Sequence, residues 1–192
     1  LEQLSPGGGF GIAYVDADDP PAVQRWAETL ARSVEDGCAR HGLPMPIVTV
    51  EPGRSIVGRA GVAVYEVGAR KEIPGVRTYV SVDGGMADNI RPSLYDAVYT
   101  AGLASREGDG MTEEVTIAGK YCESGDILIE GITVPALRQG DLLAIPAAGA
   151  YSLAMASNYN MSLRPAVVMV GEGQAKVIRR RESFEDLLRL DQ

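Results

Sequence analysis

The stretch "PIVTVEPGRSIVG", residues 46–58, places a β-branched run directly before a loop with a proline, a glycine and two charged side chains. Residues 47–50 favour a strand, and Pro52-Gly53 favours a turn at its end. Glu51 and Arg54 stand on either side of that turn. The sequence therefore predicts a strand whose C-terminal end carries a loop suited to an anion.

A helix is predicted upstream of this strand. Asp18-Asp19-Pro20-Pro21 has the acidic caps and the first-turn proline of a helix start, and His41-Gly42 is typical of a helix end. Between them apolar residues recur at helical spacing: Val23, Trp26, Ala27, Leu30, Val34 and Cys38. The order loop, helix, strand, loop is typical of an α/β barrel or a doubly wound sheet, which predicts α/β structure over residues 1–60.

The chain changes character from residue 61 onward. Short β-type runs separated by glycine follow, clearest at residues 62–67, 78–82, 127–129, 142–145 and 166–170. A short helix is expected after Ser183, with Asp186 completing a capping box. We predict a sandwich or barrel-like β-domain over residues 61–192. An α/β part this short cannot close a sheet or a (β/α)₈ barrel, which needs about 250 residues, so the α/β part is expected to be incomplete.

Composition excludes several classes of function. The 192 residues carry a formal net charge of −8, which argues against nucleic acid or an anionic membrane as the main partner. No apolar run has the length of a membrane helix, and the first residues lack the basic and apolar regions of a signal peptide. Two cysteines make no disulfide framework, which favours the cytoplasm. With His41 as the single histidine, no His/Cys metal site is expected.

Two glycine-bearing loops are candidates for an anion site. Gly7-Gly8-Gly9 could bring backbone N–H groups close to a phosphate, although a flexible turn explains it equally well. Gly53-Arg54 follows the next predicted strand, and loops at the C-terminal ends of neighbouring strands converge. Glu51 would repel a plain phosphate, but it suits a ligand that also has a cationic ring nitrogen. Pyridoxal phosphate is such a ligand.

Three later stretches, residues 82–99, 121–126 and 146–160, carry candidate substrate and catalytic groups. Arg91 is either a surface residue or a fork for a substrate carboxylate. Cys122 is either a small buried residue or a catalytic thiol beside Glu123. Tyr151 and Tyr159 could equally be core aromatics with satisfied hydroxyls.

Taken in order, these motifs resemble those of the diaminopimelate decarboxylases, pyridoxal-phosphate enzymes of the alanine-racemase-like fold type III. The resemblance covers nearly the whole chain and rests on Gly7-Gly8-Gly9-Phe10-Gly11, Glu51-Pro52-Gly53-Arg54, Val82-Asp83-Gly84-Gly85-Met86, Asp88-Asn89, Arg91-Pro92, Leu94-Tyr95, Cys122-Glu123-Ser124-Gly125-Asp126, Gly149-Ala150-Tyr151 and Ser157-Asn158-Tyr159-Asn160. It implies a (β/α)₈ barrel followed by a β-domain, in homodimers with shared active sites. Residues 1–60 would be the C-terminal part of the cofactor-binding barrel. Residues 61–192 would be the β-domain with dimer-interface and substrate-binding loops.

The resemblance also implies residue roles in the conversion of meso-diaminopimelate to L-lysine and CO₂. The cofactor phosphate would be held by Gly8, Gly9, Gly53 and Arg54, with Glu51 facing the pyridinium nitrogen and Tyr151 near both cofactor and substrate. The distal carboxylate of the substrate would be bound by Arg54, Arg91 and Tyr95, and its distal amine by Glu123. Cys122 would come from the opposite subunit and donate a proton to the carbon that has lost CO₂.

One departure from the family pattern concerns the lysine that binds the cofactor. In the family this lysine lies early in the barrel, in a segment absent here, and Lys71, Lys120 and Lys176 are expected to be solvated. The chain is therefore expected to be the C-terminal part of the enzyme, inactive without the N-terminal barrel half. Alternatives are an ornithine, arginine or carboxynorspermidine decarboxylase, or a non-catalytic assembly module that supplies Cys122 and Glu123 to another chain.

Overall fold

The computed structural model describes residues 1–192, which divide into two compact units. The first comprises Leu1–Val62 with Pro146–Ala150, and the second comprises Ala63–Ile145 with Tyr151–Gln192. The first unit contains, in chain order, β1 (Gln3–Gly7), α1 (Val23–His41), β2 (Ile47–Val50), α2 (Gly53–Val57) and the 3₁₀ turn η1 (Gly58–Ala60).

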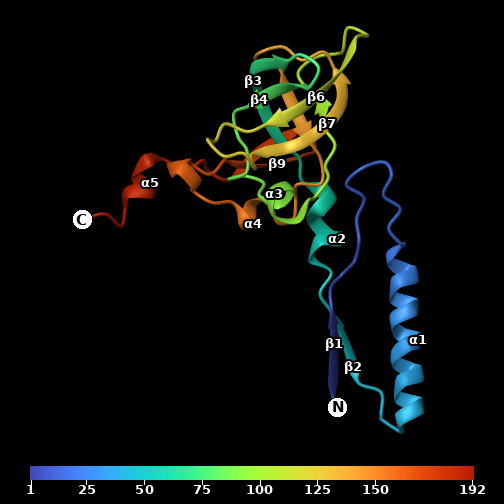
Figure 1. The fold of residues 1–192 in the computed structure, drawn as a ribbon. Helices are drawn as coiled ribbons and strands as arrows, with labels where there is room; N and C mark the ends of the chain where they lie inside the picture. The colour runs from blue at the N-terminus through green and yellow to red at the C-terminus, as the bar shows by residue number, and fades with distance from the viewer. The chain divides into compact units, whose positions relative to one another are not determined.

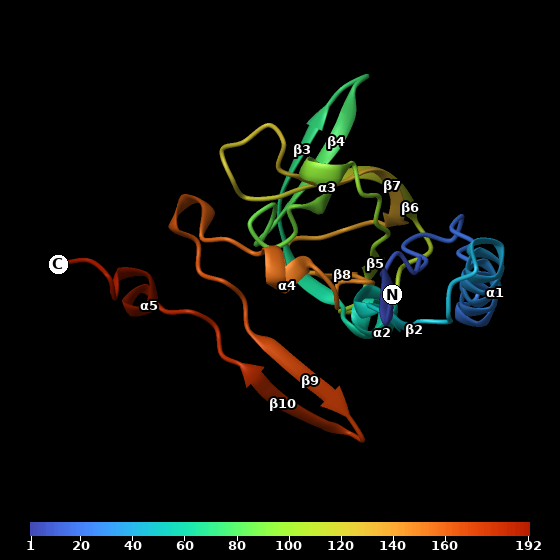
Figure 2. The ribbon, with the colours of Figure 1, turned by 90° about the horizontal axis from the view of Figure 1, so that it is seen from below.

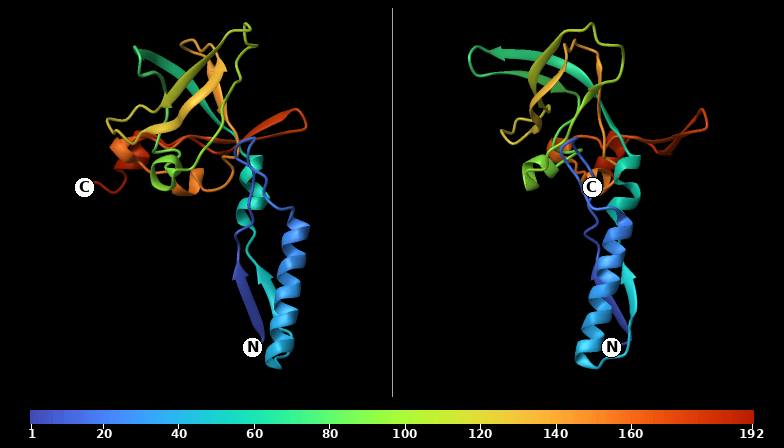
Figure 3. Two further views of the ribbon diagram at one scale, coloured as in Figure 1. Left: turned by 45° about the vertical axis from the view of Figure 1, so that its right-hand side comes forward. Right: turned by 90° about the vertical axis from the view of Figure 1, so that its right-hand side faces the viewer.

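In the first unit, helix α1 runs alongside a pair of parallel strands. β1 pairs with β2 in the register Gln3↔Ile47 and Leu4↔Val48. Figures 1 and 3 show α1 beside both strands. Parallel strands joined through a helix form a βαβ unit, which agrees with the α/β structure expected for this part of the chain.

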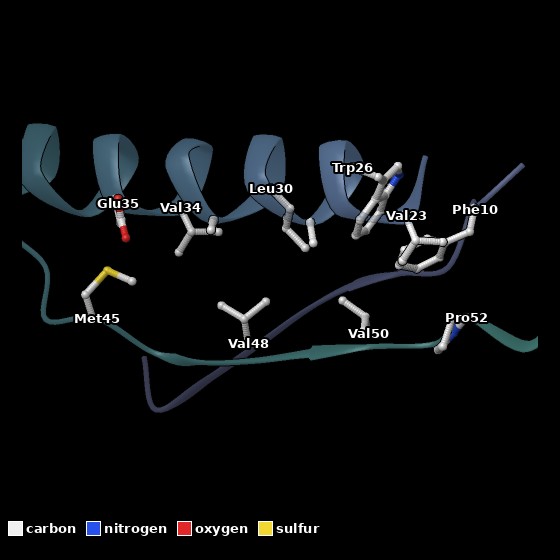
Figure 4. Close-up of a pocket in the computed structure, with 12 residues that line it drawn as sticks. Phe10, Val23, Trp26, Leu30, Val34, Glu35, Met45, Val48, Val50 and Pro52 are labelled. Carbon is white, nitrogen blue, oxygen red and sulfur yellow. The ribbon is translucent and has the colours of Figure 1, made fainter. Parts of the chain in front are cut away.

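The predicted apolar face of α1 is buried along only part of its length. Val34 and Cys38 are buried, whereas Val23 is 53% exposed. The Trp26 ring packs on Phe10 with 3.9 Å between the ring centroids. Between the helix and the strands lies an apolar pocket of about 310 Å³. Figure 4 shows Leu30 and Val34 pointing across it toward the strand that carries Val48 and Val50.

The predicted start of this helix was wrong, and its predicted end was right. α1 begins at Val23 with Ala22 as its N-cap. Asp18 does not cap it, because its carboxylate accepts the N–H groups of Tyr14 and Val15 and closes a turn further upstream. Gly42 ends the helix in the left-handed conformation, with φ of 63°, which glycine adopts without strain.

Residues 146–150 return to the first unit and pack against η1. Ala148 N–H donates to the Gly61 carbonyl and Gly149 N–H to the Gly58 carbonyl, each at 2.9 Å. A Cβ on Gly61 would overlap Gly149, and a Cβ on Gly149 would overlap the Val57 carbonyl oxygen. Glycine is therefore required at both positions for the two backbones to approach.

The second unit is built on a six-stranded mixed sheet in the order β5-β8-β3-β4-β6-β7. β4 and β6 pair in parallel and the other neighbours are antiparallel. The edge strands β5 and β7 also contact each other, so the sheet is nearly closed and barrel-like, as Figure 1 shows. Its strands are β3 (Ala63–Ile73), β4 (Arg77–Val82), β5 (Gly102–Leu103), β6 (Thr112–Ala118), β7 (Ile127–Pro135) and β8 (Leu142–Ile145).

The core of this sheet is made of β-branched and leucine side chains. The most deeply buried large side chains are Ile117, Leu143, Ile145, Val80, Val115 and Val134. They come from β4, β6, β7 and β8, and burying apolar side chains of this size is the main stabilising contribution to such a sheet. The β-type runs predicted at residues 78–82, 127–129 and 142–145 lie in these strands, and the run predicted at 62–67 lies in β3 from residue 63 onward.

The remaining elements of the second unit lie outside the six-stranded sheet. β9 (Val167–Gly171) and β10 (Gln174–Arg179) form a separate antiparallel hairpin, visible in Figure 2. α5 (Phe184–Leu188) begins with the predicted capping box between Ser183 and Asp186. The short helices are α3 (Arg91–Tyr95), α4 (Ser152–Met155) and the 3₁₀ turn η2 (Tyr159–Met161). None of the helices combines the length and the apolar character that crossing a bilayer demands.

The Asp141 carboxylate, at the turn before β8, is expected to make stability depend on pH. It accepts bonds from Arg106 Nε at 2.9 Å, Arg106 Nη2 at 2.8 Å and Arg138 N–H at 2.8 Å. These bonds, those from Arg106 foremost, hold the pKa of Asp141 below its ordinary value. Its stabilising contribution is therefore complete above the unfolded-state pKa and is lost as the pH falls through the folded-state pKa.

Urea unfolding of the native chain and of Asp141→Asn at several pH values tests this prediction. We expect the difference in unfolding free energy between them to be largest near about pH 7 and to shrink toward about pH 2. A difference that stays constant over this range would contradict the prediction.

Candidate active site

In the first unit, two loops meet where the parallel strands end. Gly8 and Gly9 follow β1, and Glu51 to Arg54 follow β2, so both loops leave the same edge of the strand pair. Glu51 N–H donates to the Gly7 carbonyl at 2.9 Å. A Cβ on Gly8 would overlap the Glu51 carbonyl oxygen. The structure thus brings the two predicted glycine loops together, and the close approach requires glycine at position 8.

These loops fit a bound phosphate group. The N–H groups of Gly8, Gly9, Gly53 and Arg54 have no acceptor within the chain. Gly9 has a φ of +89°, and a Cβ on Gly9 or Gly53 would meet nothing within 4 Å. Open space, unused backbone donors and the half-buried Arg54 are the features that a phosphate cradle needs. The residues present are therefore compatible with the phosphate of pyridoxal phosphate.

Glu51 has a partner that the sequence did not reveal. Its Oε1 accepts a hydrogen bond of 3.0 Å from the Ser5 hydroxyl, which comes from β1. Ser5 and Glu51 are 46 residues apart, and only the parallel pairing of β1 and β2 brings them together. The carboxylate itself remains exposed.

In the second unit, Arg91 lies among tyrosine rings. It begins α3, and its Nη1 donates to the Tyr99 hydroxyl at 2.9 Å. The guanidinium carbon lies 5.5 Å from the ring centre of Tyr151 and 6.0 Å from that of Tyr99. Such stacking, together with the bond to Tyr99, fixes the orientation of a guanidinium. Tyr95, at the end of α3, is 60% exposed.

Tyr99 is a member of this group that sequence reasoning missed. Its side chain is only 3% exposed, and its hydroxyl is the acceptor for Arg91. It lies in the stretch of residues 82–99, but nothing in its spacing from Arg91 distinguishes it from an ordinary core tyrosine.

Tyr151 has an unusual backbone conformation. Its φ is +69°, which is uncommon for a residue with a side chain, and it immediately precedes α4. The ring is 46% exposed and packs on the guanidinium of Arg91. A strained backbone that holds a half-exposed polar aromatic is typical of a functional position.

The loop between β6 and β7 presents Cys122 and Glu123, both exposed. Glu123 Oε2 accepts a bond from the Tyr159 hydroxyl at 3.5 Å, so Tyr159 is a neighbour of the site rather than a core residue. The Ser93 hydroxyl of α3 donates to the Gly125 carbonyl. This bond ties the helix that carries Arg91 and Tyr95 to the loop that carries Cys122 and Glu123.

Two carboxylates next to this loop have altered acidity. Asp126 is 3% exposed, and burial raises its pKa. Burial likewise raises the pKa of Asp88, although the Gly85 N–H that donates to it at 3.1 Å opposes the shift. Buried carboxylates with raised pKa values are enriched at functional sites.

None of the three lysines is buried in the folded chain. Lys71, Lys120 and Lys176 are all exposed, as expected, and Lys120 Nζ lies 5.8 Å from the centre of the Tyr121 ring. No group of three or more His, Cys, Asp or Glu side chains is placed to hold a metal ion. The apolar pocket beside α1 includes none of the predicted site residues.

Comparisons with known proteins agree with the motifs. The model of the pyridoxal-dependent decarboxylase family, C-terminal sheet domain, matches residues 15–149. The chain is 52% identical over 191 residues to a diaminopimelate decarboxylase of Synechocystis sp., covering 100% of the chain and 41% of the relative. It is 50% identical over 188 residues to that of Bacillus subtilis, covering 98% and 43%.

A solved structure is also similar. It is titled as the diaminopimelate decarboxylase of M. jannaschii in complex with L-lysine, with a TM-score of 0.91 and 34% identity. The match covers 100% of this chain and 43% of that one. The chain therefore spans about two fifths of the length of the relatives it matches.

Proposed function

The chain belongs to the pyridoxal-dependent decarboxylases, and from this we propose that it is part of an enzyme that converts meso-2,6-diaminopimelate to L-lysine and CO₂. The observation that carries the proposal is the tie between α3 and the Cys122 loop, the bond from Ser93 to Gly125. This bond connects α3, whose Arg91 can bind a carboxylate, to the loop whose Glu123 can bind an amine. A substrate with a second amino-acid group at its far end needs both.

We propose a domain arrangement that follows from the family. Residues 1–60 form the C-terminal part of a cofactor-binding (β/α)₈ barrel, supported by the parallel pair β1–β2 with α1 beside it. Residues 61–192 form a β-domain that carries dimer-interface and substrate-binding loops. The lysine that binds the cofactor is then supplied by the N-terminal barrel half, in agreement with the greater length of the relatives.

Pyridoxal phosphate is the proposed cofactor. The loop N–H groups of Gly8, Gly9 and Gly53, together with Arg54, would hold its phosphate. Glu51 would face its ring nitrogen. When bound, the cofactor supplies an electron-accepting ring for the bond cleavage. The exposed Glu51 carboxylate, held by the Ser5 hydroxyl, is suited to stabilise a protonated ring nitrogen.

The substrate would be held by groups at its far end and receive a proton at its reacting end. Arg54, Arg91 and Tyr95 bind the distal carboxylate, Glu123 binds the distal amine, and Tyr151 contacts cofactor and substrate. Cys122 donates a proton to the carbon that has lost CO₂, and it does so in the active site of a second copy. This last assignment makes a homodimer with shared active sites part of the proposal. The two free cysteines suit the cytoplasm as its location.

Steady-state kinetics on the whole natural protein that contains this chain test the function. We expect kcat/KM for meso-diaminopimelate to exceed that for ornithine, arginine or carboxynorspermidine by at least about 100-fold, because a substrate without the distal amino-acid group cannot bind both Arg91 and Glu123. Faster turnover of ornithine would overturn the substrate assignment.

A second candidate is a non-catalytic assembly module that supplies Cys122 and Glu123, both exposed on the loop between β6 and β7, to another chain. In that case the 192-residue chain binds a separate barrel-bearing chain and has no activity alone. Size-exclusion chromatography of the chain with and without such a partner distinguishes the two candidates. A chain that elutes as a monomer both with and without the barrel-bearing chain would exclude the hypothesis of an assembly module.

A further inference from the structure

The loop that presents Cys122 and Glu123 is organised around one buried side chain, Asp126. Asp126 Oδ2 accepts the Tyr121 N–H at 2.8 Å, and Oδ1 accepts the Met86 N–H at 2.6 Å. The first bond holds the residue just before Cys122. The second reaches 40 residues back, to the turn that follows β4.

The backbone of Asp126 closes the same loop. Its N–H donates to the Glu123 carbonyl at 3.1 Å, and its carbonyl accepts the Gly119 N–H at 2.9 Å. Cys122 and Glu123 thus lie in a loop, residues 119–126, whose backbone is held on both sides of them by hydrogen bonds to Asp126. Beside it, Lys120 N–H donates to the Gly84 carbonyl at 3.0 Å, a second link between the loop and the turn after β4.

Two glycines make room for this carboxylate. A Cβ on Gly119 would overlap both carboxylate oxygens of Asp126, and a Cβ on Gly85 would overlap Oδ1. The two segments that Asp126 joins therefore each lack a side chain at the point of contact. Buried carboxylates are costly unless they are well hydrogen-bonded, so the arrangement persists because both oxygens have partners.

We propose that Asp126 is a positioning residue, whose carboxylate fixes the Tyr121 and Met86 backbones together and thereby sets the directions of the Cys122 thiol and the Glu123 carboxylate. This inference rests on the proposed function for the roles of those two side chains. It adds that their placement is decided by a neighbouring carboxylate that touches neither substrate nor cofactor. A separate hydrogen bond, from the Ser93 hydroxyl to the Gly125 carbonyl, ties the loop to α3.

Amide hydrogen exchange in the intact chain tests the positioning directly. Asp126→Asn keeps a single acceptor oxygen and turns an NH₂ group toward one of the two N–H donors. We expect exchange of the Tyr121 and Met86 amides to rise by about tenfold to a hundredfold, while amides in the interiors of β6 and β7 stay unchanged.

Two further variants keep the test decisive. Gly119→Ala retains the carboxylate but displaces it, and should loosen the same two amides. Asp141→Asn removes another buried carboxylate of the same unit that accepts a backbone N–H, from Arg138 at 2.8 Å, and should leave both amides protected. Unchanged exchange at Tyr121 and Met86 in both Asp126→Asn and Gly119→Ala would overturn the proposal. A uniform rise across the unit, as in general destabilisation, would also overturn it.

Steady-state kinetics of the whole active enzyme test whether Asp126 affects substrate binding through Glu123. Loss of folded protein lowers kcat and leaves KM unchanged, whereas misplacement of Glu123 raises KM. We expect Asp126→Asn to raise KM by about tenfold in addition to lowering kcat. An unchanged KM would mean that Asp126 only stabilises the fold. If the enzyme fails to decarboxylate meso-diaminopimelate at all, the proposed function fails, while hydrogen exchange still decides the role of Asp126.

Discussion

Replacing Cys122 with alanine is expected to lower kcat of the proposed decarboxylation by about 10²- to 10⁴-fold. This is the usual contribution of a positioned general acid, and water must replace the thiol as proton donor. Cys122 is exposed on a loop that is tied at both ends, so the substitution removes a reactive group without creating a core cavity. The measurement is the rate of L-lysine formation at saturating substrate.

The second cysteine of the chain supplies a matched control. Cys38 is buried in α1, with its Sγ 3.8 Å from the Pro44 carbonyl oxygen. Cys38→Ala should lower stability and leave kcat unchanged. If Cys122→Ala retains kcat within about threefold of the native value, the thiol is not the proton donor.

Mixing inactive chains tests whether Cys122 acts in the active site of its partner. Chains with Cys122→Ala and chains with Arg54→Ala carry their defects in different halves of a shared site. A one-to-one mixture of exchanging dimers should recover about a quarter of the native active sites. No recovery after subunit exchange would show that both residues serve the same site from one chain.

Replacing Arg91 with methionine is expected to raise KM for meso-diaminopimelate by about 10- to 100-fold. A hydrogen bond to a charged group contributes about 1.5–3 kcal/mol, and methionine retains much of the side-chain volume without the charge. Arg91 is oriented by the Tyr99 hydroxyl and by the ring of Tyr151, so the loss should fall on binding.

Ornithine separates this role from a general loss of structure. It lacks the distal carboxylate, so its kcat/KM should hardly change in Arg91→Met. Equal losses for both substrates would indicate a damaged fold rather than a lost carboxylate contact. Tyr99→Phe, which removes the hydroxyl that accepts the Arg91 bond, should produce a smaller rise in KM for meso-diaminopimelate.

Elements governed by neighbouring residues could be predicted, and elements governed by distant ones could not. The β-branched run at 47–50, the glycine end of α1 and the capping box of α5 all formed as expected, because their determinants lie within a few residues. The start of α1 was predicted at the wrong place, because the Asp18 carboxylate could either cap the helix or accept upstream N–H groups. In the structure it accepts the N–H groups of Tyr14 and Val15.

The candidate site shows the same division. Motifs with distinctive residue types predicted site roles for Arg91, Tyr95, Cys122, Glu123 and Tyr151, and these roles stay predictions. The structure joins the helix of the first two to the loop of the next two. Partners that are chemically ordinary were missed. Ser5 beside Glu51 and Tyr99 beside Arg91 resemble any other serine or tyrosine until the fold places them.

The sequence by itself determined the family and the order of the strands along the chain, and it supplied the side chains that we propose bind substrate or transfer a proton. These depend on residue type and on short spacings, which a linear chain displays directly. Only the tertiary structure decided how those side chains are held: Glu51 by Ser5, Arg91 by Tyr99, and the Cys122 loop by Asp126 with Met86. The physical reason is that such hydrogen bonds join residues up to 46 positions apart, and their geometry exists only after the strands have paired.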